Sequence, residues 1–171
     1  MEYRKMGRTG LKVSEICLGT MTFGHGTDEV ESKRIIDAAF DTGVNFFDTA
    51  NSYGDGNSEV FLGNALRGRR DNAVVATKFF NPMGTGPNDS GISRLHIMQA
   101  IESSLHRLKM DHFDLHLGAV HAHPHDRSLP IRPLDLSQGR RQILLFLLTQ
   151  LHSGHRYISP RRTRHRPVRR P

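Results

Sequence analysis

The stretch that decides the fold is Val44-Asn45-Phe46-Phe47-Asp48-Thr49-Ala50-Asn51-Ser52-Tyr53-Gly54. Its first four residues are mostly β-branched or aromatic, so they predict a short buried strand. Asp48 follows this strand directly, and Tyr53 lies five residues further on. A charge at the end of an apolar strand loses its hydration, which is costly unless a partner neutralises it. The stretch therefore predicts a strand that delivers polar side chains to a site at its carboxyl end.

Three further apolar runs repeat this pattern along the chain. They cover residues 16–18, 73–76 and 113–117, and a segment over 3–14 with a Gly-rich turn predicts a hairpin ahead of them. The four runs start at positions 16, 44, 73 and 113, which is the spacing of strands that alternate with helices. Such strands are parallel and are joined by right-handed crossovers. We therefore predict an α/β fold with about the first four βα units of a (β/α)8 TIM barrel.

The segments between these runs have the features of helices with defined ends. Asp28 is the expected N-cap of the first helix and Gly43 its stop, and Ser93 is the expected N-cap of the third. A shorter helix is expected over 58–66. An open doubly wound sheet is the alternative arrangement. It is disfavoured because no G-x-G-x-x-G motif follows the run at 16–18.

Three polar residues stand just beyond predicted strands, where a parallel barrel places its active site. They are Asp48, Tyr53 and Lys78. On neighbouring strands, Asp48 and Lys78 can neutralise each other's charge. A lysine beside a tyrosine also favours the phenolate form of the phenol. This combination suits a tyrosine that donates a proton to a carbonyl oxygen. A strand-end ion pair without a catalytic role is the alternative interpretation.

Several further motifs accompany these three residues. They are Arg4-Lys5-Met6-Gly7-Arg8-Thr9-Gly10-Leu11-Lys12-Val13-Ser14, Leu18-Gly19-Thr20-Met21-Thr22-Phe23-Gly24, Ser58-Glu59, Ala76-Thr77-Lys78, Ser104-Leu105-His106-Arg107-Leu108 and Asp114-Leu115. Together with the stretch quoted first, they resemble the aldo-keto reductase family over about two-thirds of the chain. The resemblance implies a barrel of aldo-keto reductase type. It also implies an NADPH-dependent oxidoreductase that reduces a small aldehyde or ketone to an alcohol.

The resemblance also implies roles for individual residues. Tyr53 is the expected proton donor, Lys78 the partner that favours its phenolate, and Asp48 the residue that orients the lysine. Asp48 is in addition expected to contact the cofactor. The segment Gly19-Thr20-Met21 matches the part of the family that lies near the nicotinamide ribose, so these three are candidate cofactor-binding residues.

The family carries a fourth catalytic residue, a histidine on the fourth strand, in a stretch that resembles D-L-Y-Q-V-H. This chain has Asp114-Leu115-His116-Leu117-Gly118-Ala119-Val120-His121 instead, which places Ala119 at the expected position. The nearest Val-His pair ends at His121. Since an insertion of two residues restores the alternation of a strand, His121 is the candidate for this role. Its chance occurrence in a His-rich segment is the alternative.

The end of the chain differs from the rest in composition. Residues 1–118 hold 13 Lys/Arg and 15 Asp/Glu, whereas residues 119–171 hold 11 Arg, no Lys and 2 Asp/Glu. We therefore divide the chain into the N-terminal half of a barrel, 1–117, and an Arg-, His- and Pro-rich tail, 118–171, which we expect to be disordered. Arginine in place of lysine, with Leu, Pro and His, is typical of GC-rich DNA read out of frame. The tail is interpreted as a frameshift product, with a genuine disordered segment as the alternative.

This tail bears on activity and on partners. None of it resembles the loops with which the family holds NADPH, so we expect a truncated and inactive copy. Non-specific binding of nucleic acid or of an anionic surface is the alternative function. The arginines available for it are Arg161, Arg162, Arg164, Arg166, Arg169 and Arg170. Nucleic acid is disfavoured because only Tyr157 could stack on bases. No metal is predicted, since His121, His123 and His125 alternate in a segment without periodicity.

The remaining features concern location and association. Cys17 is the only cysteine, so a reducing, cytoplasmic location is expected, and its apolar neighbours predict a buried core thiol. The longest apolar run, 143–148, is far shorter than the roughly 18–20 residues of a membrane span. A helix docked on the open barrel is the alternative to disorder for this run.

A half barrel also leaves two sheet edges and an apolar interior face. Val44, Phe46, Val74 and Phe113, or their alternating neighbours, are therefore expected to be exposed. Exposed apolar surface of this size predicts self-association or aggregation.

Overall fold

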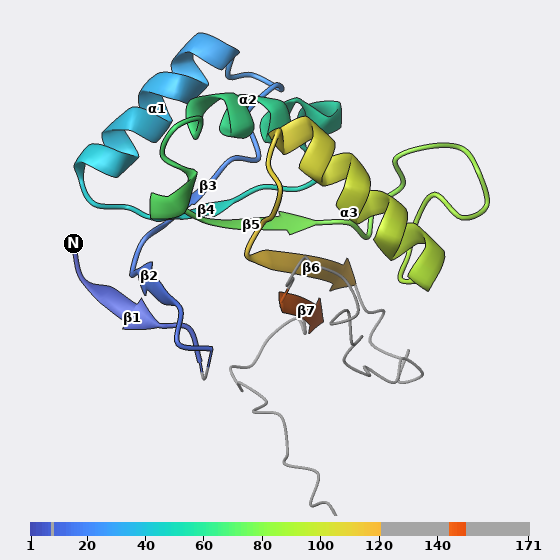
Figure 1. Cartoon of the computed structure of the whole chain (residues 1–171). Helices are drawn as coiled ribbons and strands as arrows, with labels where there is room; N and C mark the ends of the chain where they lie inside the picture. The colour runs from blue at the N-terminus through green and yellow to red at the C-terminus, as the bar shows by residue number, and fades with distance from the viewer. Residues whose placement is uncertain (8, 121–143, 150–171) are drawn as a thin grey trace, which may run out of the picture.

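The structure is a computed structural model, and it describes residues 1–7, 9–120 and 144–149 (Figure 1). The described residues form a two-stranded hairpin, a five-stranded sheet and three α-helices with two short 3-10 helices. The elements are β1 (Tyr3–Lys5), β2 (Lys12–Ser14), β3 (Cys17–Gly19), α1 (Glu29–Asp41), β4 (Phe46–Asp48), η1 (Tyr53–Gly56), α2 (Asn57–Ala65), η2 (Arg70–Asn72), β5 (Val74–Lys78), α3 (Arg94–Leu108), β6 (Leu115–Val120) and β7 (Leu144–Thr149).

The five-stranded sheet has the order β3-β4-β5-β6-β7, and every neighbouring pair of strands is parallel. The strand order follows the chain order, which distinguishes a barrel segment from a doubly wound sheet, where the order reverses. All three helices lie on one face of the sheet, as they do on the outside of a barrel (Figure 1). The predicted fold class is therefore confirmed, although the described strands do not close into a barrel.

The strand β7 corrects the prediction for the apolar run at 143–148. We expected disorder, with a docked helix as the alternative, but Leu144–Thr149 is a strand that pairs with β6 along its whole length, from Leu115↔Leu144 to Val120↔Thr149. A run of six apolar residues fits either element by periodicity. A helix of that length gains few hydrogen bonds for the cost of its nucleation, whereas the edge of β6 offers a row of backbone partners. The sheet therefore has one parallel strand more than the four that were predicted.

The helix ends confirm the predicted caps. The Asp28 carboxylate accepts a hydrogen bond of 2.8 Å from the Glu31 N–H, and the Ser93 hydroxyl accepts one of 3.1 Å from the His96 N–H. Gly43 follows α1 with a φ of +87°, a conformation that favours glycine. The strands begin one or two residues later than the apolar runs. Of the first residues of these runs, Val44, Ala73 and Phe113 are buried and Ile16 is exposed, and all four lie outside the strands.

The main core lies between the sheet and the helices. Helix α1 contributes Ile35, Ile36, Ala39 and Phe40 to it, as its apolar spacing predicts. Helix α3 contributes Ile97, Ile101, Leu105 and Leu108. Helices α2 and α3 approach closely at Gly63, where an added Cβ would lie 2.1 Å from the Leu108 carbonyl oxygen. Only glycine fits at this crossing.

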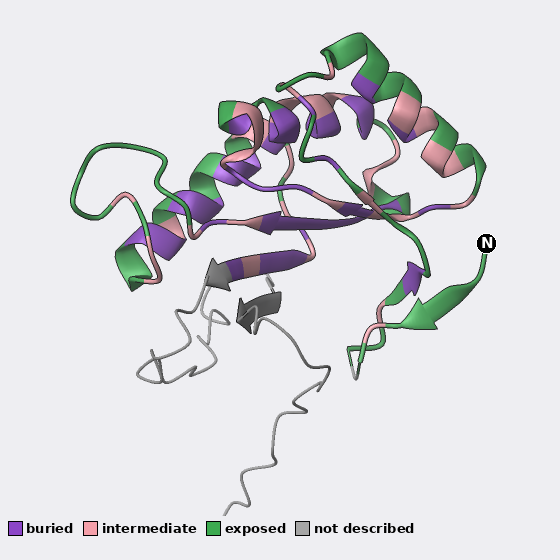
Figure 2. Ribbon diagram, turned by 180° about the vertical axis from the view of Figure 1, so that it is seen from behind, coloured by how far each residue is buried: buried purple, intermediate pink, exposed green. Residues whose placement is uncertain are grey.

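A second, smaller cluster corrects the prediction of an exposed interior face. Val74, Ala76 and Leu115 of the sheet pack here against Val13 of the hairpin. The hairpin therefore covers this face near the amino-terminal ends of β5 and β6. Of the four residues expected to meet water, Val44, Val74 and Phe113 are buried, and Phe46 is half-buried. Figure 2 shows that most of β5 and β6 is buried. Phe113 belongs to the main core on the helix side.

Cys17 also differs from its prediction, because it is exposed. In β3, only Leu18 packs against the helix-side core, and Cys17 points the other way, in register with Phe46. The apolar run around it indicated a strand covered on both faces, yet β3 is an outer strand of the described sheet. Partial burial and the charge of Asp48 raise the pKa of the Cys17 thiol. The thiol is therefore protonated near neutral pH and is a poor nucleophile.

Candidate active site

The structure brings Asp48, Tyr53 and Lys78 together at the carboxyl end of the sheet. The Lys78 Nζ donates hydrogen bonds of 2.5 Å to Asp48 Oδ2, 2.9 Å to the Thr49 carbonyl oxygen and 3.2 Å to Tyr53 Oη. The same Nζ lies 4.7 Å from the centroid of the Tyr53 ring. The ion pair is largely shielded, with side-chain exposures of 18% for Lys78 and 28% for Asp48. Screening by water is therefore weaker here than at an exposed pair.

The strands explain why the two charges meet. Asp48 is the last residue of β4 and pairs with Ala76, while Lys78 is the last residue of β5, two positions further along the same side. Residues two apart on a strand project to the same face. Both side chains thus leave the sheet on the face away from the helices, at the end where β4 and β5 stop.

Tyr53 is held by a tight turn. Gly54, Asp55 and Gly56 have positive φ values of 55°, 54° and 92° in succession. At Gly54, an added Cβ would lie 2.6 Å from the Phe23 carbonyl oxygen, so a side chain here would push the turn away from the loop that follows β3. The turn therefore needs glycine for both its conformation and its packing.

Three hydroxyl groups, those of Thr20, Thr49 and Ser58, connect the segment after this turn to the sheet. The buried Ser58 Oγ lies 2.7 Å from Thr20 Oγ1 and 2.9 Å from Thr49 Oγ1, and it donates a hydrogen bond of 2.9 Å to the Thr20 carbonyl oxygen. These contacts join the start of α2 to the residues that follow β3 and β4. Ser58 belongs to the motif Ser58-Glu59 quoted above, but its contacts with Thr20 and Thr49 were not predicted.

A buried ion pair lies beside these hydroxyls. Glu59 of α2 is fully buried, and its Oε2 accepts a hydrogen bond of 2.6 Å from Arg107 Nε of α3. Its Oε1 accepts one of 2.5 Å from Thr77 Oγ1 of β5. Glu59 and Arg107 both belong to motifs quoted above, but their contact joins residues 48 positions apart. The sequence contains no local signal for this contact.

The candidate cofactor residues lie beside this cluster. Gly19 is the last residue of β3 and pairs with Asp48, and an added Cβ there would meet nothing within 4 Å, so open space adjoins the aspartate. Thr20 is fully buried, and its hydroxyl lies 3.1 Å from the Asp48 carbonyl oxygen. Met21 is 66% exposed. Of the three residues Gly19, Thr20 and Met21, only Gly19 and Met21 therefore present surface to a ligand.

The fourth predicted residue, His121, lies outside the described residues. The described part of β6 ends at Val120 and has Ala119 at the position that the family resemblance assigns to histidine. His116 of the same strand is fully buried on the helix side, in register with Thr77, so it does not face the cluster.

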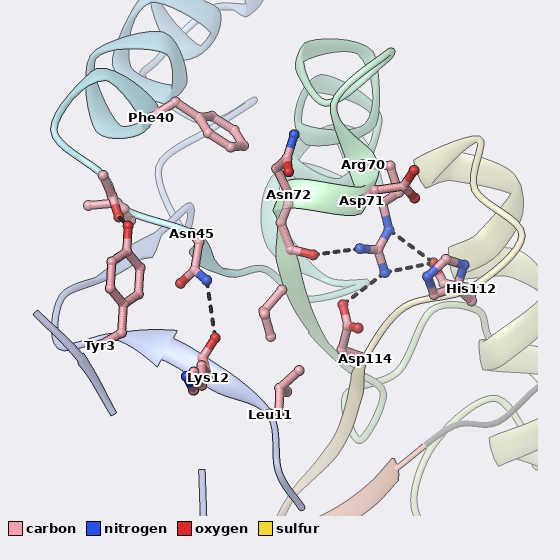
Figure 3. A pocket seen from close by; sticks show the side chains of 14 residues that line it. Tyr3, Leu11, Lys12, Phe40, Asn45, Arg70, Asp71, Asn72, His112 and Asp114 are labelled. Atoms are coloured by element: carbon pink, nitrogen blue, oxygen red, sulfur yellow. Dashed lines mark hydrogen bonds and ion pairs between the residues drawn. The ribbon is translucent and has the colours of Figure 1, made fainter. Parts of the chain in front are cut away.

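A hollow among the described residues lies at the opposite end of the sheet (Figure 3). It measures about 640 Å³ and is lined by residues that precede β4, β5 and β6. Its most buried cation, Arg70, donates to the Ala73 and His112 carbonyl oxygens and to Asp114 Oδ2. These contacts leave the guanidinium little capacity for a ligand. The hollow is thus a gap beneath the hairpin and not an active site.

The cluster at the carboxyl end can hold and move a proton. A phenol that touches an ammonium group, itself anchored by a carboxylate, can release its proton while the ammonium stabilises the remaining negative charge. Within 1–7, 9–120 and 144–149, no three His, Cys, Asp or Glu side chains are grouped so as to hold a metal ion. No helix in these ranges is long and apolar enough to cross a membrane.

Comparisons with known proteins agree with this arrangement. A sequence profile of the Aldo/keto reductase family matches residues 15–144. Two relatives described as probable voltage-gated potassium channel subunit beta, from Oryza sativa subsp. japonica and Arabidopsis thaliana, are 43% identical over 135 residues, covering 77% of this chain and 40% of theirs. The uncharacterized oxidoreductase YrpG of Bacillus subtilis is 48% identical over 127 residues, covering 68% of this chain and 39% of its own length.

A solved structure gives the same result. The aldo-keto reductase AKR11C1 from Bacillus halodurans, in its holo form, superposes with a TM-score of 0.63 at 38% identity, over 70% of this chain and 40% of that one. The fold and the cluster define a protein built on a parallel α/β barrel sheet with polar groups at its carboxyl end. The chain belongs to the aldo-keto reductase family, which is a family of oxidoreductases. It spans about two fifths of the length of the relatives it matches.

Proposed function

We propose that Asp48, Tyr53 and Lys78 form the proton-donating part of an NADPH-dependent carbonyl reductase, acting on a small aldehyde or ketone. The observation that carries this proposal is the contact of 3.2 Å between Lys78 Nζ and Tyr53 Oη, with the lysine anchored on Asp48. The open space beside Gly19, next to Asp48, fits the nicotinamide end of the cofactor. An ion pair without catalytic function would not need the tyrosine.

The roles of the residues follow from this geometry. NADPH supplies the hydride that reduces the carbonyl carbon. Tyr53 Oη gives its proton to the carbonyl oxygen, so that the product leaves as a neutral alcohol. Lys78 stabilises the phenolate through its ammonium charge, and Asp48 and the Thr49 carbonyl hold that ammonium in place. The tyrosine is restored when it takes up a proton from water.

Transfer of this site into a longer chain tests the proposal. We expect no measurable NADPH oxidation by the 171-residue chain with aromatic aldehydes, because no part of 119–171 resembles the family's cofactor loops. We expect a chimera of residues 1–117 with the C-terminal part of YrpG to reduce them. Tyr53→Phe should lower its kcat about 10²–10⁴-fold, as for loss of a general acid.

The matched control is Tyr3→Phe, which removes the same hydroxyl from the hairpin, where it donates to the Gly43 carbonyl. This variant should keep the full rate. A folded chimera that reduces aldehydes equally well with Tyr53→Phe would contradict the proposed role of the tyrosine. Rapid NADPH oxidation by the unmodified chain would contradict the expected inactivity.

We also propose that the chain self-associates through the β3 side of its sheet. Two large apolar residues flank this strand in exposed positions, Ile16 at 60% and Met21 at 66% exposure. We expect sedimentation velocity at micromolar concentration to show oligomers, which an Ile16→Lys/Met21→Lys variant should lose. The control Val30→Lys/Leu95→Lys, at equally exposed helix positions, should keep them. A monodisperse wild-type monomer would contradict this proposal.

No described residue favours the alternative function, nucleic-acid or anionic-surface binding. The six arginines on which it depends, between 161 and 170, lie outside the described residues. Within the tail, 118–120 and 144–149 are parts of strands. The expected disorder of the rest lies outside the described residues, and the cytoplasmic location stays a prediction from the sequence.

A further inference from the structure

A fully buried carboxylate lies behind the active site and takes no part in the chemistry proposed above. Each oxygen of Glu59 has one short contact, Oε1 with Thr77 Oγ1 at 2.5 Å and Oε2 with Arg107 Nε at 2.6 Å. Arg107 also reaches Ser104 Oγ at 3.4 Å. A charge with no exposed surface is costly to place in a protein, and apolar residues of similar volume often stabilise a fold as well as a buried ion pair does. The position of its partners suggests what this charge does.

One partner belongs to the strand that carries the catalytic lysine. Thr77 immediately precedes Lys78 in β5, and its side chain points to the helix side while that of Lys78 points to the site. The hydrogen bond between Thr77 and Glu59 therefore fixes the position of the end of β5, which carries Lys78. Among the described residues, Glu59 is the only side chain that forms a hydrogen bond with the Thr77 hydroxyl.

The other partner lies against the turn that carries the tyrosine. The aliphatic part of Arg107 packs on Gly56, where an added Cβ would lie 2.7 Å from Arg107 Cδ. Gly56 closes the 3-10 turn that begins at Tyr53, and Glu59 follows three residues later in α2. Arg107 thus contacts this turn, and the Glu59 carboxylate holds the arginine in place.

We propose that Glu59 is a positioning residue that sets the distance between Tyr53 and Lys78. It acts through Thr77 on the lysine's strand and through Arg107 on the tyrosine's turn. Charge-assisted hydrogen bonds are short and directional, so they fix these two elements more tightly than apolar packing would. The 3.2 Å contact between Lys78 and Tyr53 is at the long end for a hydrogen bond, and a small outward displacement would break it. This inference rests on the proposed role of the Lys78–Tyr53 pair.

Carbon-13 NMR of the full chain tests it without turnover. With tyrosine labelled at Cζ, the chain gives signals from Tyr3, Tyr53 and Tyr157 only, and Tyr53→Phe identifies the signal of interest. The Cζ shift reports the hydrogen bond at the phenol oxygen, and Lys78→Met defines the shift of a tyrosine that has lost it. We expect Thr77→Val, which keeps the shape and removes the hydroxyl, to move the Tyr53 signal at least about half of the way to that position.

Glu59→Gln should move the signal in the same direction, and Thr77→Ser, which restores the hydroxyl, should leave it at the wild-type position. The matched control is Asp114→Asn, which weakens a comparably shielded ion pair with Arg70 at the opposite end of the sheet. It should lower stability and leave the Tyr53 signal in place. The inference is overturned if the signal stays unchanged in Thr77→Val and Glu59→Gln. A signal unmoved by Lys78→Met would instead contradict the proposed function, and with it the premise of this inference.

Discussion

Replacement of Arg107 by leucine is expected to lower the free energy of unfolding by about 3–5 kcal/mol, as for other buried ion pairs that lose one partner. The reason is the fully buried Glu59, whose carboxyl group loses the guanidinium 2.6 Å away. The lost contact of the arginine stem with Gly56 adds to this effect. Equilibrium unfolding in urea, followed by circular dichroism, measures the change.

Two further variants separate the buried charge from the loss of an ion pair in general. In Glu59→Met/Arg107→Leu both charges are absent, so most of the lost stability should return. Arg4→Leu breaks the pair of Arg4 with Glu15 on the hairpin, where the arginine is 75% exposed, and should cost at most about 1 kcal/mol. An Arg107→Leu cost no larger than that of Arg4→Leu would show that water reaches Glu59 and that its burial is not the source of the effect.

The features that could be predicted from the sequence depend on neighbours along the chain. Asp28 and Ser93 cap helices through contacts with residues three positions on, so their side chains and spacing were sufficient evidence. The contacts of Lys78 with Asp48 and Tyr53 are long-range, and they were predicted. The meeting of Asp48 and Lys78 follows from topology, because parallel strands that are neighbours end at the same edge of the sheet.

The features that could not be predicted depend on what covers each face. The run around Cys17 is apolar on both sides, but only the side of Leu18 has helices on it. Whether 144–149 forms a strand depends on the free edge of β6, which has no local signal. Glu59 meets Thr77 and Arg107 at separations of 18 and 48 residues, which no local pattern in the sequence indicates.

His116 is a second buried polar residue, and it has no compensating partner. It lies in β6 on the helix side, with its ring 4.4 Å from Phe79 and 5.0 Å from Phe113, centroid to centroid. Neither ring nitrogen has a hydrogen-bond partner, whereas nearby His96 bonds the Phe79 carbonyl oxygen at 2.7 Å. Burial, assisted by the charge of His96, lowers the pKa of His116 from 6.5 to about 3. The folded chain therefore holds this imidazole neutral at pH values where the unfolded chain protonates it.

The stability of the folded chain should therefore fall as the pH falls below 6.5. Above pH 6.5 the ring is neutral in the folded and the unfolded chain, so it does not change how stability depends on pH. Below pH 6.5 only the unfolded chain gains a proton on this ring, until the pH approaches 3. Each pH unit in this window should cost about 1.4 kcal/mol of stability. In His116→Phe, which keeps a flat ring between Phe79 and Phe113, this loss should be absent.

We therefore expect the stability advantage of His116→Phe over wild type to grow by roughly 2–3 kcal/mol between pH 7 and pH 4.5, measured by urea unfolding at both values. At pH 7 the advantage should be smaller, because relief of two unpaired ring nitrogens is partly offset by the larger volume of phenylalanine in a packed site. His106→Gln at an exposed position of α3 is the control, and its difference from wild type should stay the same at both pH values. If the two histidine variants show the same pH dependence, then His116 is hydrated in the folded chain, and the packing of Phe79 and Phe113 around it is looser than the structure describes.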